Sequence, residues 1–494
     1  MNVTVNGNPI VAHAGETLFA ALTRAGLFSG GLCGGAGRCG RCQVTVTAGD
    51  APVTAADRAH LSAEEIAAGR RLACALTLTD DLSVTLPAQK PFTVQGLAAT
   101  AAPPANGDLG AAVDIGTTTL AFALVDLQTG AVVGTASLLN SQRAYGADVL
   151  SRVHACERGE QPRLTEMVRG DVLRGLRTLC ERAGVGTERL KAVTVVGNTA
   201  MCQLFTGFDC APLAQYPFEP FDNAPFTADA ATLFGTPGLA ASVTVPPPAG
   251  PFFGADALAG LAVCGFAERS GVGVFLDLGT NAELAVGGRD GVFAASAAAG
   301  PAFEGGALSC GCGSIEGAVC DVTLGGDVPR VVTVGNAEPV GLCGSGVVAL
   351  LAELLRTGAM DASGLLQPPY FDEGFPVTPS LRLLQGDVRA VQLAKGAVSA
   401  GLKVLMKRAG VTCDDVDRVW LAGGFGAALS PEKAAAVGLL PPELVAKAEA
   451  VGNTALAGAV RALLGGAANL PPITTVDLNA DEEFPILFFN SMEF

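Results

Sequence analysis

The chain has 494 residues, of which 49% are hydrophobic and only 16% are charged, so it holds ample apolar material for packed cores. A single core seldom grows beyond about 250 residues, and we therefore expect two to four domains. The net charge of −16 argues against unspecific binding to DNA, RNA or anionic membranes. The N-terminus lacks the basic start of a signal peptide, and no stretch reaches the ~18 uncharged apolar residues of a membrane span. We expect a soluble cytoplasmic protein.

Residues 1–87 predict a small β-grasp domain. Two short strands within residues 2–12 are joined by the turn residues Asn6, Gly7 and Asn8. Thr17 is suited to cap a helix over residues 18–25. The remaining expected elements are a glycine-rich cysteine loop, a strand at residues 43–47, a helical piece near residues 55–67 and a final strand before residue 88.

Four cysteines of this front domain follow the spacing C-x5-C-x2-C, then 31 residues, then a last cysteine; they are Cys33, Cys39, Cys42 and Cys74. Three thiolates on one loop and a fourth from a distant strand suit a [2Fe–2S] cluster of ferredoxin type. The loop must curl around the cluster sulfurs, and residues that tolerate positive φ are present at Gly34, Gly35, Gly37 and Gly40. The alternative is a zinc site or a loose thiol cluster, although zinc sites usually pair two C-x2-C knuckles and this segment has one.

Residues 88–110 are rich in Ala, Pro and Gly and lack periodicity, which predicts a flexible linker. About 23 such residues reach ~75 Å when fully extended. The cluster-bearing domain could therefore swing between partners. Residues 111–494 form the large remainder, with expected halves of approximately 111–270 and 271–494.

Two segments of the remainder are built alike, each with the pattern strand, D-x-G-T turn, strand, turn, strand. The first carries Asp114, Gly116, Thr117 and Thr118, and the second, 163 residues later, carries Asp277, Gly279, Thr280 and Asn281. Backbone N–H groups of such a turn can cradle phosphate oxygens, and the hydroxyls add donors. A carboxylate on the preceding strand can hold hydrated Mg²⁺ or orient a water molecule. One copy alone is an ordinary hairpin, but two copies that could face each other across a cleft favour a phosphate site.

Two further glycine-rich turns precede helices. One follows a buried strand at residues 416–422 and holds Gly423, Gly424 and Phe425; the other holds Gly344, Ser345 and Gly346. A nucleoside could lie against the backbone there, and a helix N-terminus favours anionic groups. Close packing of helix on strand is the alternative for each.

These elements, in this order, resemble the sugar kinase and actin superfamily of ATPases (the ASKHA fold). With a ferredoxin in front, the chain resembles the ATP-dependent reductive activators of corrinoid proteins, and the resemblance covers nearly its whole length. The x5 cysteine spacing is similar to that of activator-type ferredoxins. Supporting phrases are NSQRAYGADVLSRV at 140–153, VVGNTAM at 195–201, FFGADALAG at 252–260, AAGPAFEGGALSCG at 298–311, GLCGSG at 341–346 and VQLAKGAVSAG at 391–401.

The resemblance implies an enzyme that uses ATP to move one electron from its cluster to Co(II) of a corrinoid protein, remaking Co(I) for a corrinoid-dependent methyltransferase system. Its implied cofactors are the [2Fe–2S] cluster, ATP and Mg²⁺. Implied partners are the corrinoid protein, an upstream low-potential electron donor and a second copy of the chain bound through the ATPase domain. We hypothesise that Asp114 and Asp277 are catalytic, on Mg²⁺ or water, and that the glycine-rich turns bind phosphates and nucleoside.

The chain also departs from that family. Larger members carry an extra domain between ferredoxin and ATPase, and this chain has Cys202 where histidine is expected. Cys310, Cys312 and Cys320 invite a second-metal reading, without an obvious fourth ligand. The rival functions are a small-molecule kinase with a regulatory cluster, for which Asp256 and Glu283 are candidate bases, and an electron-carrier scaffold with an inactive ATPase fold.

Overall fold

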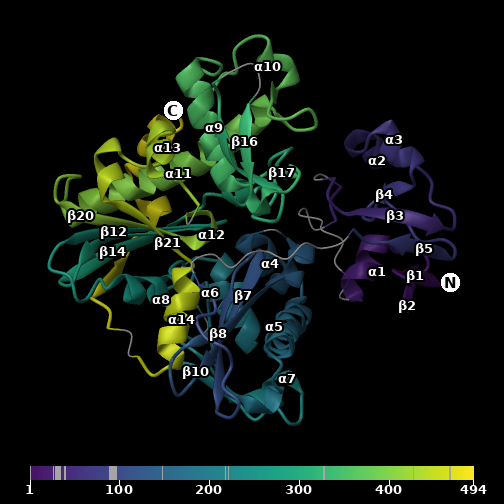
Figure 1. The fold of residues 1–494 in the computed structure, drawn as a ribbon, viewed down its shortest axis with the longest axis horizontal. Helices are drawn as coiled ribbons and strands as arrows, with labels where there is room; N and C mark the ends of the chain where they lie inside the picture. The colour runs from purple at the N-terminus through teal and green to yellow at the C-terminus, as the bar shows by residue number, and fades with distance from the viewer. Residues whose placement is uncertain are drawn as a thin grey trace.

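The computed structural model describes residues 2–25, 27, 35–37, 40–87, 97–146, 148–216, 218–220, 222–325, 329–426, 428–466 and 469–494. Three sheet-based units follow one another along the chain (Figure 1). We call them the front unit (residues 2–87), the first lobe (the sheet between β6 and β11) and the second lobe (the sheet between β12 and β22). In the part of the chain that is described, no helix combines the length and apolar character that a bilayer span requires.

The front unit is a five-stranded sheet in the order β2-β1-β5-β3-β4, with β1 parallel to β5, as a β-grasp requires. The Thr17 hydroxyl accepts from the Ala20 N–H at 3.2 Å and caps α1 (Leu18–Arg24), as predicted. The helical piece expected near residues 55–67 is two helices, because Ser62 starts a new capping box that interrupts the first. Its other elements are β1 (Val3–Val5), β2 (Asn8–Ile10), β3 (Gln43–Ala48), β4 (Arg70–Leu72), β5 (Leu82–Thr85), α2 (Ala55–His60) and α3 (Ala63–Ala67).

The first lobe has a six-stranded sheet in the order β10-β11-β9-β6-β7-β8. β6 and β7 form an antiparallel hairpin, and β9 lies parallel to β6 on the other side. The strands are β6 (Leu109–Ile115), β7 (Thr119–Asp126), β8 (Val132–Leu139), β9 (Leu190–Gly197), β10 (Phe226–Asp229) and β11 (Ser242–Val245). Its helices are α4 (Val149–Glu157), α5 (Gln161–Ala183), α6 (Thr199–Thr206) and α7 (Ala230–Phe234).

The second lobe repeats this plan with the order β21-β20-β12-β13-β14-β22. Its hairpin is β12 and β13, and β20 lies parallel to β12. The strands are β12 (Val272–Leu278), β13 (Ala282–Gly288), β14 (Gly291–Ala297), β20 (Val416–Ala422), β21 (Ala448–Gly452) and β22 (Ile473–Thr475). Its helices are α9 (Gly344–Thr357), α10 (Tyr370–Glu373), α11 (Gln385–Ala409), α12 (Gly423–Gly426), α13 (Pro431–Ala436) and α15 (Phe484–Asn490). The predicted fold class, a ferredoxin-like front followed by a duplicated ASKHA-type fold, is confirmed.

Smaller elements decorate the lobes. A three-stranded sheet is formed by β15 (Ala318–Thr323), β16 (Arg330–Thr333) and β17 (Gly341–Leu342), and a pair by β18 (Phe375–Pro376) and β19 (Arg382–Leu383). The 3₁₀ turns are η1 (Ser141–Tyr145), η2 (Thr187–Arg189), η3 (Ala211–Ala214), η4 (Pro301–Glu304), η5 (Val334–Asn336), η6 (Pro442–Lys447) and η7 (Leu478–Ala480).

The linker predicted at residues 88–110 is described from residue 97 onward. Leu97 packs against the core of the first lobe, and the Thr100 N–H donates to the Val132 carbonyl of β8 at 2.8 Å. Residues 88–96 of that prediction lie outside the described residues.

The lobes exchange one helix each. α8 (Ala255–Cys264) follows the first-lobe strands, yet its Ala257 and Leu261 pack against Phe275 and Trp420 of the second lobe. α14 (Thr454–Leu463) follows the second-lobe strands, yet it packs into the core of the first lobe. The two helices lie against each other at the junction of the lobes (Figure 1). This crossing fixes how the two hairpins face one another.

Gly458 makes that crossing close, because a Cβ at this position would lie 2.3 Å from the Ala259 carbonyl oxygen. We expect Gly458→Ala to destabilise the protein by about 1–3 kcal/mol, since the helices must move apart. Gly170→Ala is the control, since that glycine lies in α5 with nothing within 4 Å of the added carbon. Alanine there should stabilise by about 0.5–1 kcal/mol through helix propensity. Urea unfolding followed by the fluorescence of Trp420 measures both; equal signs would contradict the role of the close contact.

Candidate functional site

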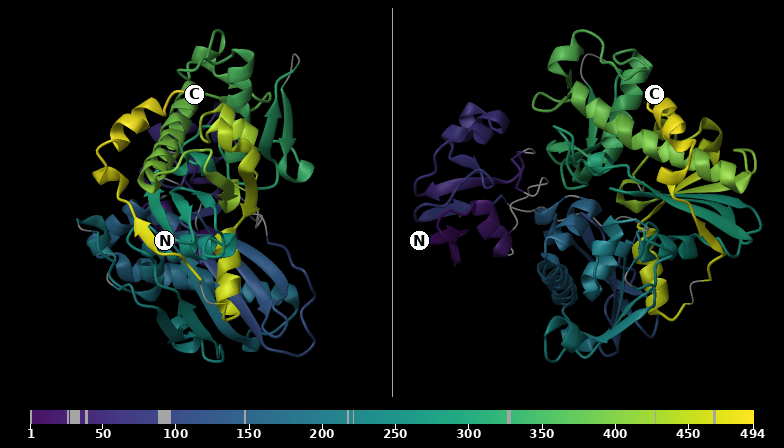
Figure 2. Two further views of the ribbon diagram at one scale, coloured as in Figure 1. Left: turned by 90° about the vertical axis from the view of Figure 1, so that its left-hand side faces the viewer. Right: turned by 180° about the vertical axis from the view of Figure 1, so that it is seen from behind.

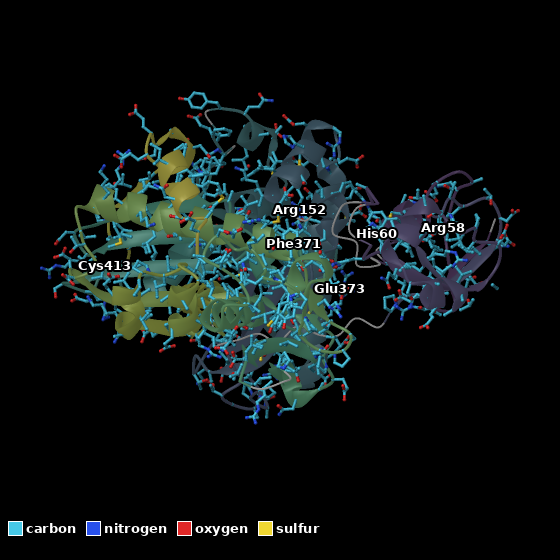
Figure 3. The ribbon with its side chains drawn as sticks, turned by 90° about the horizontal axis from the view of Figure 1, so that it is seen from above. Arg58, His60, Arg152, Phe371, Glu373 and Cys413 are labelled. Carbon is cyan, nitrogen blue, oxygen red and sulfur yellow. The ribbon has the colours of Figure 1, made fainter. Side chains whose placement is uncertain are left out.

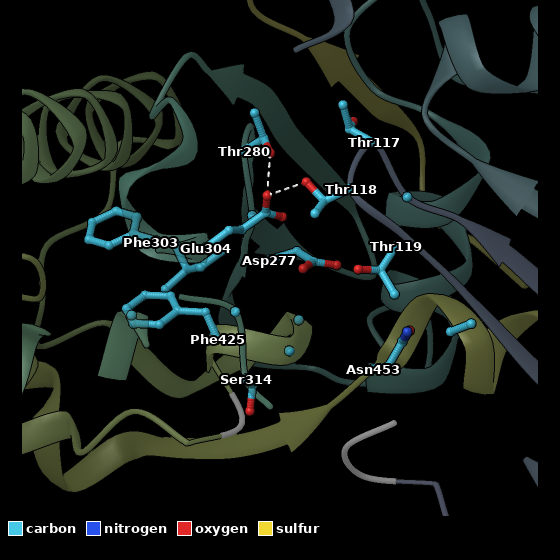
Figure 4. A pocket seen from close by; sticks show the side chains of 18 of the residues that line it. Thr117, Thr118, Thr119, Asp277, Thr280, Phe303, Glu304, Ser314, Phe425 and Asn453 are labelled. Carbon is cyan, nitrogen blue, oxygen red and sulfur yellow. Dashed lines mark hydrogen bonds between the residues drawn. The ribbon is translucent and has the colours of Figure 1, made fainter. Parts of the chain in front are cut away.

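A pocket between the two lobes is lined by both predicted phosphate turns (Figure 4). All but one of the site residues predicted in residues 111–494 line it, namely Asp114, Gly116, Thr117, Thr118, Asp277, Gly279, Thr280, Asn281, Gly344, Ser345, Gly423, Gly424 and Phe425. The exception is Gly346, whose added Cβ would lie 2.0 Å from the Val319 carbonyl oxygen. That glycine allows α9 to pack closely on β15.

Each phosphate turn is a tight hairpin placed by its strands. The Gly116 N–H donates to the Thr119 carbonyl at 3.0 Å, and the Gly279 N–H donates to the Asn281 carbonyl at 3.1 Å. A Cβ on Gly116 would lie 2.6 Å from the Thr119 oxygen, so this turn requires glycine. Both turns are thus closed by a glycine N–H, but the first is one residue longer, since Ile115 pairs with Leu120 whereas Leu278 pairs with Ala282.

The first turn is braced from behind by residues 140–152. The Asn140 side chain donates to the Gly116 carbonyl at 2.9 Å. Arg152 is fully buried and donates to the Thr117 carbonyl, and its Nη1 lies 3.3 Å from the Gln142 Oε1. Burial lowers the pKa of Arg152 to about 9, so it stays protonated at neutral pH. A buried cation directly behind the turn favours an anion in front of it.

One carboxylate joins the two turns. The hydroxyls of Thr118 and Thr280 both donate to Oε2 of Glu304, at 2.7 and 2.6 Å, as Figure 4 shows. Donors from both lobes thus converge on one anionic oxygen. This is the arrangement that phosphate oxygens need, with Glu304 in their place.

Four further carboxyl groups line the pocket and repel one another. Burial raises the pKa of Asp114 to about 6 and that of Asp277 to about 8. Burial, followed by the charge of Asp114, raises the pKa of Asp256 to about 7, and burial followed by Asp256 raises that of Glu283 well above its usual range. Such a cluster is stabilised by a divalent cation, which relieves burial and repulsion together.

The donor set fits hydrated Mg²⁺. Among the described residues, no three side chains of His, Cys, Asp or Glu are placed to chelate a metal directly. Mg²⁺ keeps several waters and binds through one or two carboxylates and substrate phosphates, so such a cage is not needed. Asp114 and Asp277 are the next-to-last residues of the strands that lead into the two turns, so their carboxylates could contribute to such a site.

Sequence reasoning gave no role to two asparagines in this pocket. The Asn453 side chain donates to Asp114 Oδ2 at 2.9 Å, and the Asn198 side chain donates to the Thr117 hydroxyl at 3.3 Å. Each also caps a helix after a strand, α14 and α6 respectively. The signal was available, since VGNTA occurs twice, at 196–200 and at 451–455. Glu304 and Arg152 were missed as well, although both lie in phrases that carry the family resemblance.

The predicted nucleoside side of the pocket is flat and aromatic. Phe303 and Phe425 stack with ring centroids 4.7 Å apart and planes 7° from parallel (Figure 4). Glycine lets the backbone approach closely at two positions beside this surface. A Cβ on Gly344 would lie 1.9 Å from the Phe303 carbonyl oxygen, and a Cβ on Gly423 would lie 2.5 Å from Asp277 Oδ1. A purine base suits such a surface.

The cysteine loop of the front unit is described in part. Cys33 and Cys39 lie outside the described residues, as does Gly34. Cys42 is buried and Cys74 is partly exposed; a hydrogen bond with Cys42 is the main cause that lowers the pKa of Cys74 to about 7. Gly35, Gly37 and Gly40 have positive φ, as predicted. Two adjacent thiols beside such a loop fit a [2Fe–2S] cluster, in which thiolates are the ligands.

His60 packs on this loop. Its ring lies 3.2 Å from the Gly37 carbonyl, and a Cβ on Gly40 would lie 2.8 Å from the His60 Cβ. Figure 3 places His60 and Arg58 on the front unit. The predicted curl of the loop is thus supported by a side chain from α2.

The remaining cysteines that the sequence singled out do not form a second metal centre among the described residues. Cys312 lines the pocket, and burial raises its pKa to about 12. Cys202, where histidine was expected, is buried and donates to the Gly197 carbonyl at 3.3 Å. These thiols therefore stay protonated at neutral pH.

Comparisons with known proteins match the chain along its length. Residues 271–494 match the family model of the C-terminal domain of RACo, the ASKHA domain; residues 109–269 match the RACo middle region. Residues 3–79 match the 2Fe–2S iron-sulfur cluster binding domain, which favours the cluster over a zinc site. These results support a 2Fe–2S domain at the front of the chain and an ASKHA domain behind it.

Two curated proteins and one solved structure resemble the whole arrangement. "Corrinoid activation enzyme RamQ" of Eubacterium limosum is 32% identical over 412 residues, which are 76% of this chain and 68% of that protein. "[Co(II) methylated amine-specific corrinoid protein] reductase" of Methanosarcina barkeri is 26% identical over 380 residues, 70% of this chain and 68% of that protein. The structure named "Reductive activator for corrinoid,iron-sulfur protein" aligns with a TM-score of 0.71 and 26% identity, covering 100% of this chain and 98% of that one.

Arg152→Lys tests the brace behind the first turn. Lysine keeps the charge but cannot reach the Thr117, Gly146 and Gln142 acceptors together. We expect the Kd of a Mg²⁺-bound, non-hydrolysable ATP analogue to rise about tenfold, since one hydrogen bond to a charged group is lost. Calorimetric titration measures it, with the exposed Arg158→Lys as control. An unchanged Kd in a folded Arg152→Lys protein would show that the turn needs no such support.

Proposed function

Because the chain belongs to the RACo family of corrinoid-protein activators, we propose that it uses ATP to reduce Co(II) of a corrinoid protein to Co(I). This reaction restores a corrinoid-dependent methyltransferase or demethylase after its cobalt has been oxidised. The observation that carries the proposal is the convergence of Thr118 and Thr280 on one anionic oxygen, in a chain whose front unit pairs Cys42 with Cys74.

Each part of the molecule has a role in this proposal. Residues 1–87 hold the cluster, residues 88–110 link it, and residues 111–494 bind and hydrolyse ATP. The cluster supplies one electron when it is bound by Cys33, Cys39, Cys42 and Cys74. The two turns hold phosphates, Asp114 and Asp277 hold Mg²⁺ or orient water, and the stacked Phe303 and Phe425 adjoin the nucleoside.

ATP is required for an energetic reason. Ferredoxin-type [2Fe–2S] centres lie near ~−400 mV, and the Co(II)/Co(I) couple is expected to be lower. A step that is uphill by ~100 mV costs ~2.3 kcal/mol for one electron. Nucleotide binding or hydrolysis can offset this cost only if the nucleotide states differ in affinity for the conformations of the protein.

The proposal includes partners. A corrinoid protein accepts the electron, and an upstream low-potential donor must recharge the cluster after each transfer. A homodimer through the ATPase domain and a cytoplasmic location stay predictions.

The first test is the reaction itself. The cluster-loaded protein, a reductant and a Co(II) corrinoid protein from the same genome are mixed without oxygen, and the cobalt absorption bands are followed. We expect Co(I) bands to grow only when Mg-ATP is present. Reduction at the same rate without ATP, with several corrinoid proteins, would overturn the proposal, and phosphorylation of an added small molecule would favour a kinase.

Asp114→Asn separates ATP hydrolysis from cluster binding. The amide cannot carry the charge that holds Mg²⁺ or orients water, so we expect ATPase activity to fall about 10²–10³-fold, the usual cost of losing one catalytic group. The visible spectrum of the cluster should not change. Asp290→Asn is the matched control, because Asp290 is exposed in the turn between β13 and β14 of the second lobe. Normal hydrolysis by Asp114→Asn would remove this residue from the site.

A further inference from the structure

The front unit lies beside the two lobes (Figure 2) and contacts both of them. On the first lobe, Ala144 and Tyr145 of η1 and Met167 of α5 pack into the hydrophobic core of the front unit. Arg163 also donates to the Arg24 carbonyl at 2.9 Å, at the C-terminal end of α1. The first-lobe side of this contact is thus mainly apolar.

The second-lobe side is polar and depends on Arg41. Its Nη2 lies 2.7 Å from the Gly311 carbonyl oxygen, 2.9 Å from that of Leu308 and 3.4 Å from that of Gly305. Arg41 immediately precedes Cys42 in the sequence. A single guanidinium beside the cysteine loop therefore holds a set of backbone carbonyls of the second lobe.

Both docking segments adjoin residues that hydrogen-bond to the phosphate turns. η1 begins after Asn140, which donates to the Gly116 carbonyl. The segment that Arg41 contacts begins one residue after Glu304, which accepts from Thr118 and Thr280. The front unit thus rests on the outer ends of elements whose inner ends form the pocket.

The second segment is a compact loop. A Cβ on Gly305 would lie 2.0 Å from the Cys312 carbonyl oxygen, and one on Gly311 would lie 2.4 Å from the Gly305 oxygen. The two ends of residues 305–312 are therefore in backbone contact. Ser309 anchors the segment to α11 through two hydrogen bonds of 2.6 Å to Asp387. Because Glu304 directly precedes this compact loop, a displacement of Glu304 would strain the loop whose carbonyls Arg41 contacts.

Phosphate and Glu304 compete for the same donors. The two threonine hydroxyls have one hydrogen each and now give both to Glu304. A phosphate oxygen that takes them also brings negative charge next to the carboxylate, which raises the energy of the present position of Glu304.

We propose that Glu304 and Arg41 form a latch, in which nucleotide phosphate displaces Glu304, shifts residues 305–312 and releases the cluster-bearing front unit from the second lobe. This inference rests on the proposed function, since it assumes that the pocket binds ATP. It gives the nucleotide a defined effect: without ATP the front unit is held by both lobes, and with ATP only the first-lobe contact remains, so that the front unit can turn toward the corrinoid protein.

Linkage gives the latch a sharp test. If nucleotide binding must break the Arg41 contact, the free energy of that contact weakens nucleotide binding. Removing the contact by mutation therefore lowers the Kd of the nucleotide by the factor that corresponds to this free energy. We expect Arg41→Ala to lower the Kd of Mg-AMP-PNP about tenfold, the value of one hydrogen bond to a charged group. Arg41→Lys should fall between Arg41→Ala and the parent chain. The control is Arg58→Ala, an exposed arginine on α2 of the same unit, which should change nothing.

The measurements are calorimetric titration and small-angle X-ray scattering of the full cluster-loaded chain. In the parent chain Mg-AMP-PNP should lengthen the maximum dimension, whereas Arg41→Ala should be extended before nucleotide is added. An unchanged or weaker Kd in Arg41→Ala, or a parent chain that binds the analogue without extending, overturns the latch and leaves the proposed function intact. Failure of the parent chain to bind the analogue overturns both.

Discussion

Two threonine hydroxyls that meet on one oxygen of Glu304 are the interaction on which the rest of the structure depends. One hydroxyl comes from each half of a duplicated fold, so they meet only if the halves face each other at the correct spacing. The exchanged helices α8 and α14 set that spacing, and Gly458 lets them approach to backbone contact. Packing at the junction therefore decides the geometry of the polar site beside it, whose lining includes Asp256 of α8 and Ala455 of α14.

In the protein alone, the pocket concentrates acidic side chains. Asp114, Asp256, Asp277 and Glu283 crowd one cavity, where two like charges 4 Å apart repel by about 4 kcal/mol at an effective dielectric constant of 20. Burial is the main cause of the raised pKa values of these groups, and repulsion by neighbouring carboxylates adds to it for Asp256, Asp277 and Glu283. A nucleotide adds more negative charge, so it must arrive with a divalent cation. In the proposed function, the hydroxyls, the turn N–H groups and buried Arg152 serve the phosphates, and the carboxylates serve the metal.

The local parts of this site could be predicted from the sequence, because a D-x-G-T turn or a strand–glycine–helix junction is specified by adjacent residues. The duplication and the β-grasp also follow from short patterns. Contacts between distant residues could not be predicted: Asn453 meets Asp114 across 339 residues, and Arg41 meets Gly311 across 270. Gly346 was assigned to the nucleoside but serves helix packing, since both uses of glycine look alike in a sequence. The helix expected at residues 55–67 is split, because Ser62 can cap a new helix as readily as it can continue the first.

The strength of the front-unit contact suits a device that must open. Hydrogen bonds from a guanidinium to carbonyls are worth about 1.5–3 kcal/mol each, so the two N–H groups of the Arg41 Nη2 contribute at most about 3–6 kcal/mol, and less where solvent reaches them. A nucleotide bound with micromolar affinity releases about 8 kcal/mol. Breaking the Arg41 contact therefore consumes only part of the binding free energy, so ATP can open it and still bind. A buried ion pair in its place would hold the front unit more firmly, and losing one partner would cost about 3–5 kcal/mol. The carbonyls that Arg41 contacts lie on a segment that is anchored at Ser309 and, in the latch, displaced through Glu304. The contact is therefore specific and can still be released. A tethered electron donor requires such a contact if its electrons are to leave only when ATP is present.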